Sequence, residues 1–65
     1  MIRVNGEPAP VDEGTTVTAL LEAIDAPPRG VAVAVDGEVV PRTAWGSTQL
    51  ADGARVEVLS AMQGG

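Results

Sequence analysis

The sequence has 65 residues, no Cys and no His, and a formal net charge of −5, with four Arg and no Lys. A chain of this length forms one domain with a small core, and it lacks both the thiols of a disulfide and the usual zinc ligands. The acidic balance argues against a nucleic-acid partner, because phosphate contacts need a clustered basic face.

The first predicted element is a β-hairpin. Residues 2–4 alternate apolar and polar side chains, and Asn5-Gly6 is the strongest short-range hairpin signal. We expect the return strand over residues 7–12, where Pro8 and Pro10 cannot donate hydrogen bonds to a sheet. Alternate residues direct their N–H groups to the same side of a strand. The two positions without a donor can therefore face a free sheet edge, while Ala9 and Val11 face the partner strand.

The second predicted element is an amphipathic helix. Thr15 or Thr16 can cap its N-terminus. An apolar stripe with helical spacing follows at Val17, Leu20, Leu21 and Ile24. Pro27-Pro28 is expected to end the helix, because proline cannot continue the hydrogen-bond pattern.

A second hairpin is predicted after the helix. Residues 31–35 are a β-branched run typical of an interior strand, with Ala32 and Ala34 on its small-residue face. Asp36-Gly37 turns the chain back into a strand over residues 38–40.

The remaining segment is expected to be irregular until the last strand. Residues 43–49 predict a short or single-turn segment, in which Trp45 closes the bottom of the core with its N–H at the surface. Leu50 should point inward, and Asp52-Gly53 should turn the chain into a last strand over residues 55–59. In that strand the valines are expected to face inward and the charged residues outward.

The predicted order is β-β-α-β-β-β within a single domain, residues 1–65, with a flexible tail at about residues 60–65. One helix laid across one face of a mixed sheet of four to five strands is the economical α+β arrangement. The two hairpins leave a central position that the last strand can fill beside the first strand. We therefore predict a β-grasp (ubiquitin-like) fold, with the proline-bearing strand at one edge.

The residue inventory argues against an enzyme. Catalysis by nucleophiles and by general acids or bases usually recruits His, Cys or Lys, and the chain has none of these. Its carboxylates fall mainly at predicted turns, so we assign no catalytic or metal-binding residue and no bound cofactor. No apolar run is long enough for a membrane helix and no signal pattern begins the chain, so we expect a cytoplasmic protein with no membrane partner.

The sequence ends in Gly64-Gly65 directly after the last predicted strand. Two residues without Cβ form a thin segment that can enter a narrow channel. A terminal carboxylate at Gly65 would be unhindered and ionised at neutral pH. A random chain would end in two glycines roughly 0.5% of the time, so the pair is a weak but real signal.

Taken along the whole chain, the residues resemble the ThiS family of sulfur carrier proteins of thiamine (thiazole) biosynthesis. The resemblance rests on Asn5-Gly6, Thr16-Val17, the strand at residues 31–35, Val39-Val40-Pro41-Arg42 with Trp45, Leu50-Ala51-Asp52-Gly53, Val56-Glu57-Val58 and Gly64-Gly65. The Val-Pro-Arg-x-x-Trp pattern is the most specific of these, whereas the terminal glycines are shared by the whole superfamily. Asp36 departs from the Asn found in many relatives, and both residues suit a turn with positive φ.

The resemblance implies a defined chemistry for the tail. A ThiF-like adenylating enzyme, using ATP and magnesium that this chain does not itself bind, would convert the Gly65 carboxylate into an acyl-adenylate. Sulfur, ultimately from a cysteine desulfurase, would then form a thiocarboxylate that a ThiG-like thiazole synthase consumes. Gly64 would provide the slim approach to Gly65, and Leu59, Ala61 and Met62 are the candidate partner-docking residues.

Other functions stay open from the sequence. The sulfur could serve molybdopterin or cysteine synthesis, or Gly65 could be joined to lysines as in a ubiquitin-like protein modifier. A non-covalent adaptor that does not need its terminal glycines is a further alternative. In each case we expect a monomer when the protein is free.

Overall fold

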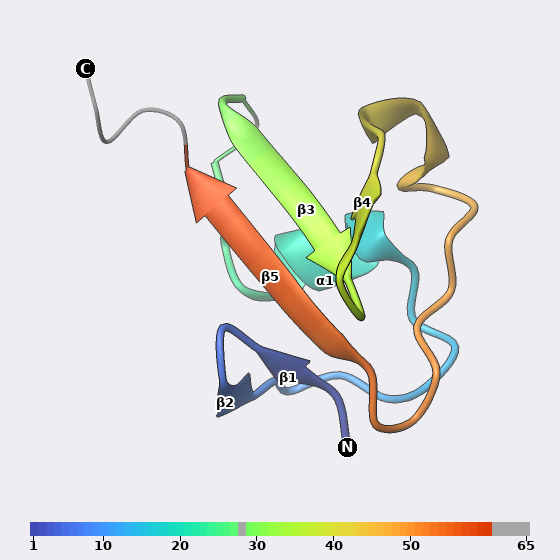
Figure 1. The fold of residues 1–65 in the computed structure, drawn as a ribbon. Coiled ribbons are helices and arrows are strands. Elements are labelled where there is room, and N and C mark those ends of the chain that lie inside the picture. Colours follow the sequence, from blue (N-terminus) through green and yellow to red (C-terminus); the bar gives the residue numbers. More distant parts are fainter. Residues whose placement is uncertain (28, 61–65) are drawn as a thin grey trace.

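The structure is a computed structural model that describes residues 1–27 and 29–60. Figure 1 shows one α-helix beside a five-stranded sheet. The elements in chain order are β1 (Arg3–Val4), β2 (Glu7–Pro8), α1 (Val17–Ala23), β3 (Val31–Val35), β4 (Glu38–Val40), the 3₁₀ helix η1 (Arg42–Ala44) and β5 (Arg55–Ser60). This order confirms the predicted β-β-α-β-β-β arrangement.

The last strand lies in the middle of the sheet, whose strand order is β2-β1-β5-β3-β4 (Figure 1). β5 runs parallel to β1 and antiparallel to β3, with which it pairs from Val31↔Ser60 to Val35↔Val56. The strand that leads into the expected tail is therefore held on both sides. This placement confirms the β-grasp fold.

The core lies between α1 and the inner face of the sheet. Its buried residues, each at most 7% exposed, are Ile2, Val17, Leu20, Leu21, Val33, Leu50, Ala54 and Val56. The apolar stripe predicted for the helix supplies three of them, and Leu50 points inward as expected. Burial of each large aliphatic side chain contributes about 1.5–3 kcal/mol, so this small cluster is the main source of stability.

The helix begins as predicted but ends for another reason. Thr16 is the N-cap, and its Oγ1 accepts a hydrogen bond from the Ala19 N–H at 3.1 Å. The expectation that Pro27-Pro28 ends the helix is wrong, because α1 ends at Ala23. Asp25 adopts φ 60°, and the N–H of Ala26 donates to the Leu21 carbonyl in the pattern of a Schellman motif.

The strand predicted over residues 7–12 is much shorter. β2 pairs with β1 only at Glu7 and Pro8, although the Ala9 N–H still donates to the Ile2 carbonyl at 2.9 Å. Pro10 lies at a bend, where the chain leaves the sheet towards the helix. The predicted edge position is confirmed, because β2 has a neighbour on one side only.

Candidate functional site

The described end of β5 is the part of the candidate site that the structure places. The strand extends to Ser60, one residue beyond the predicted 55–59. Leu59, a predicted partner-docking residue, is 66% exposed and lies opposite Ala32. The other predicted site residues, Ala61, Met62, Gly64 and Gly65, lie outside the described residues.

An apolar patch surrounds Leu59 on the face of the sheet that points away from α1. Side chains alternate along a strand, so the buried Val33 and Val56 place their neighbours on the opposite, open face. Register then gathers four apolar residues on β3, β4 and β5, and we call this the sheet patch: Ala32, Ala34, Val39 and Leu59. Val39 is 77% exposed, so the patch presents two large side chains on either side of a flat alanine floor.

Three charged side chains share the open face with the sheet patch. Glu57 lies opposite Ala34, between Leu59 and Arg55 on β5, and two arginines lie beyond it. Arg3 of β1 and Arg55 of β5 are exposed and lie in direct parallel register. Like charges placed opposite each other weaken a sheet, so this arrangement is not explained by stability. An apolar patch with Glu57 beside it and two arginines beyond suits a partner surface that combines apolar side chains with charges of both signs.

The Asn5 side chain fixes the C-terminal half of β5. β1 ends at Val4, and the side-chain amide of Asn5 continues its pairing with β5. Its Nδ2 donates to the Val58 carbonyl at 3.1 Å, and its Oδ1 accepts from the Val58 N–H at 2.9 Å. The amide thus acts as one further peptide group, so β5 stays fixed to within two residues of its end.

Asp36 makes a related contact at the other end of β5. Its Oδ1 accepts from the Arg55 N–H at 2.9 Å, and its own N–H donates to the Arg55 carbonyl at 2.8 Å. The sequence predicted both residues as turn formers, and their positive φ values of 52° for Asn5 and 50° for Asp36 confirm this. The contacts with β5 were not predicted, because they depend on which strand lies beside each turn.

Trp45 packs against the core cluster as expected, and its indole N–H is bonded within the chain. The half-buried indole Nε1 donates to the Val40 carbonyl at 2.9 Å. The Arg42 guanidinium lies 5.4 Å from the centroid of the ring, close enough for a cation–π contact. The first and last residues of the Val-Pro-Arg-x-x-Trp pattern are therefore hydrogen-bonded to each other, because the Trp45 side chain bonds to Val40 at the end of β4.

The carboxylates do not form a metal centre among the residues that the structure describes. Asp52, at the turn before β5, forms an ion pair with the N-terminal ammonium of Met1. The hydrogen bond from this ammonium, followed by its positive charge, lowers the pKa of Asp52 from its ordinary value of 3.8. Within the same described ranges, no helix is long and apolar enough to cross a bilayer.

Comparison with known proteins gives consistent similarities along the whole chain. The model of the ThiS family matches residues 2–65. The sulfur carrier protein ThiS of Thermus thermophilus is 40% identical over 65 residues, which cover 100% of both chains.

Solved structures show the same relationship. The crystal structure of a thiamine biosynthesis protein (ThiS) from Geobacter metallireducens superposes with a TM-score of 0.81 at 43% identity, covering 98% of this chain and 97% of that chain. A solution NMR structure of a thiamine biosynthesis protein from the same organism gives a TM-score of 0.72 at 41% identity, covering 89% and 78% of the two chains.

Proposed function

The chain belongs to the ThiS family, and on that basis we propose that it is a sulfur carrier protein of thiamine biosynthesis. The observation that carries the proposal is the family match, which continues through residue 65 and includes Gly64-Gly65. The central position of β5, directly before the tail, supports it. In this role the protein is not an enzyme but the substrate of one and the sulfur donor of another.

The first step activates the Gly65 carboxylate. A carboxylate is a poor electrophile, because substitution at its carbon would have to expel oxide. In the ThiF-like enzyme, a carboxylate oxygen of Gly65 attacks the α-phosphorus of ATP and displaces pyrophosphate. The product is an acyl-adenylate, from which AMP can leave. The absence of Cβ atoms at Gly64 and Gly65 lets the tail reach this phosphorus through a narrow channel.

The second step loads and delivers sulfur. A cysteine desulfurase supplies sulfur as a persulfide, which a thiol reductant converts to sulfide while the thiol is oxidised to a disulfide. The sulfide attacks the acyl carbon and displaces AMP. The resulting Gly65 thiocarboxylate donates its sulfur to the thiazole ring in a ThiG-like synthase. The carrier's own residues bind partners and position the tail, while ATP and magnesium belong to the activating enzyme.

The sheet patch is the proposed docking surface for these partners. Its exposed Val39 and Leu59 are large apolar side chains, the type that anchors an interface when it is buried by a partner. Leu59 lies close to the tail, so docking there would fix where the tail enters the partner. Arg3 and Arg55 would add specificity and a faster association through contacts with acidic side chains.

Intact-mass analysis tests the proposed chemistry. The protein is incubated with a ThiF-like enzyme, ATP, magnesium and a sulfur source, and we expect a mass gain equal to the replacement of one oxygen by sulfur. Fragmentation should place this gain at Gly65. Deletion of Gly65, or addition of one alanine after it, should abolish the gain without changing the circular dichroism spectrum.

Other outcomes would identify other functions. Unmodified protein in the presence of a demonstrably active enzyme would contradict the carrier proposal. Conjugates of higher mass with lysine-containing proteins would indicate a protein modifier instead. A thiocarboxylate that supports molybdopterin or cysteine synthesis, but not thiazole formation, would retain the chemistry and change the pathway.

A charge substitution tests the docking surface. Leu59→Asp should raise the KM for the carrier in the adenylation assay by about tenfold or more, since loss of a buried apolar anchor typically costs over 1 kcal/mol. Ala51→Asp is the matched control, because it adds the same charge at an exposed residue in the loop before β5. Equal KM values for the two variants would remove the sheet patch from the proposal.

A further inference from the structure

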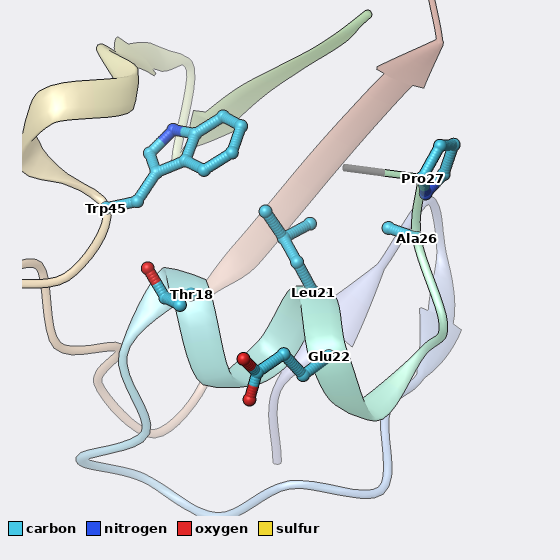
Figure 2. Close-up of a pocket in the computed structure, with 6 residues that line it drawn as sticks. All are labelled: Thr18, Leu21, Glu22, Ala26, Pro27 and Trp45. Carbon is cyan, nitrogen blue, oxygen red and sulfur yellow. The ribbon is translucent and has the colours of Figure 1, made fainter. Parts of the chain in front are cut away.

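A hollow of about 220 Å³ opens between α1 and the segment that follows η1 (Figure 2). One side is formed by Thr18, Leu21 and Glu22 of α1, and Ala26 and Pro27 continue this side beyond the helix. The Trp45 ring faces them from the other side (Figure 2). The hollow lies at the helix layer of the molecule, whereas the sheet patch faces away from the helix.

The walls of the hollow are fixed by hydrogen bonds within the chain. The Thr18 N–H donates to the Trp45 carbonyl at 3.3 Å, which joins the two sides directly. The Val17 N–H donates to the Thr48 carbonyl at 3.0 Å, which holds the start of α1 to the same loop. Because the indole N–H is bonded to Val40, the ring can offer only its apolar surface and π-electrons. A site preorganised in this way loses little entropy when it is filled.

The size of the hollow selects the kind of occupant. Small-molecule and cofactor sites usually have about 300–1,000 Å³, so this hollow falls below their range. Its volume is nevertheless larger than that of a few water molecules, each of which occupies about 30 Å³ in the liquid. A single long side chain from another protein matches this space.

The charge at the hollow indicates which type of side chain would bind there. Glu22 is the ionisable residue among the described residues that line it, and it makes no ion pair within residues 1–27 and 29–60. The Arg42 guanidinium already lies 5.4 Å from the centroid of the Trp45 ring, so an incoming cation is expected at the Glu22 carboxylate rather than beside Arg42. An apolar wall next to an exposed carboxylate suits an arginine, whose stem is aliphatic and whose end is cationic.

We propose that this hollow is a second docking site, which binds an arginine side chain of a partner protein. The stem lies along Leu21, Ala26 and Pro27, and the guanidinium interacts with Glu22. The net charge of −5 favours a partner with a basic surface. Because the sheet patch faces the other way, a partner can occupy the hollow while the sheet patch and the tail are engaged. The proposal does not depend on the sulfur chemistry.

A peptide titration tests the proposal. The probes are acetyl-Gly-Arg-Gly-amide and the same peptide with citrulline, which has nearly the same shape but no charge. Trp45 is the single aromatic residue of the chain, so its fluorescence reports directly on one wall of the hollow. At constant ionic strength we expect a saturable change with the arginine peptide, and we expect the citrulline peptide to bind about two- to fivefold more weakly, as for an exposed ion pair.

Two substitutions test whether the Glu22 carboxylate binds the guanidinium. Glu22→Gln should weaken binding of the arginine peptide by about two- to fivefold, through loss of one exposed ion pair. Glu57→Gln changes the net charge equally but lies on β5, away from the hollow, so it should leave the affinity unchanged. Equal weakening by both substitutions would reduce the effect to the overall charge, and a non-saturable response would overturn the proposal. Stronger binding of the citrulline peptide would also overturn it, because the occupant would then be uncharged.

Discussion

The two hairpin turns of this protein look equivalent in sequence and differ in the chemistry that they require. In each turn an Asn or Asp precedes a Gly, and all four residues have positive φ, from 50° to 87°. Both turns also contact β5, but Asn5 satisfies a donor and an acceptor of Val58 with its side chain, whereas the Asp36 side chain only accepts, from Arg55. A carboxylate can replace an amide at the second turn and not at the first.

Alanine substitution should produce the largest difference between the turns. Asn5→Ala loses two hydrogen bonds and the tolerance of Asn for positive φ, which together cost about 2–4 kcal/mol in the free energy of unfolding. Asp36→Ala loses one side-chain hydrogen bond and should cost about 1 kcal/mol less. Urea denaturation followed by circular dichroism measures both. Equal losses would mean that the second Asn5–Val58 hydrogen bond adds no stability.

Exchange of the two side chains should separate turn preference from hydrogen bonding. Asn5→Asp keeps a residue that favours the turn but sets a carboxylate oxygen against the Val58 carbonyl, so we expect a loss of about 1–3 kcal/mol. Asp36→Asn retains an acceptor for the Arg55 N–H and should change stability by less than about 0.5 kcal/mol. Amide hydrogen exchange at Val58 should accelerate beyond the global effect only in the Asn5 variant. Equal exchange rates in the two variants would contradict the role assigned to the Asn5–Val58 hydrogen bonds.

Substitution of the glycines should show where the turns are truly equivalent. Gly6 and Gly37 have φ values of 84° and 87°, and a Cβ at either would meet nothing within 4 Å. Gly6→Ala and Gly37→Ala should therefore each cost about 1–2 kcal/mol, from backbone conformation alone. Thermal unfolding of the two variants should give similar shifts in Tm. A much larger shift at one turn would indicate a contact that the backbone does not explain.

The turn at Asp52-Gly53 gives the smallest expected effect, because its acidic side chain pairs with the N-terminal ammonium rather than with β5. Since this contact lowers the pKa of Asp52 in the folded state, its stabilisation is present above the ordinary pKa of 3.8 and is lost as pH falls through the folded value. An NMR titration of the Asp52 carboxyl should show the lowered pKa. Acetylation of the N-terminus should return it towards the ordinary value, with little change in stability at neutral pH because both groups are exposed.

Much of the fold was predictable because local sequence strongly restricts local structure. The Asx-Gly pairs, the Thr16 cap and the apolar stripe of the helix all act within a few residues, and the structure confirms each. The predicted helix end was wrong because a conspicuous stop signal in the sequence lies just beyond the residue that ends the helix. Pro27-Pro28 was the obvious helix stop, yet Asp25 in the left-handed conformation ends the helix first.

The candidate site was predictable to a different degree. The Gly-Gly pair and the family pattern are properties of the sequence, and Leu59 was identified from its position in the last strand. The sheet patch, the arginine pair and the hollow were not predicted, because each joins residues from separate elements. Their positions depend on strand register and helix placement, which local patterns do not specify.

The sequence by itself determined where the two hairpins turn and most of the residues that form the core, since these follow from backbone preferences and burial of apolar side chains. It also carried the pattern of residues that marks the family. Tertiary structure alone decided that Asn5 meets Val58, 53 residues later, and that Trp45 faces the helix. Such contacts form only when β5 enters the centre of the sheet. The physical reason is that hydrogen bonds and packing between distant segments depend on the assembled geometry, whereas turns and amphipathic periodicity act along the chain.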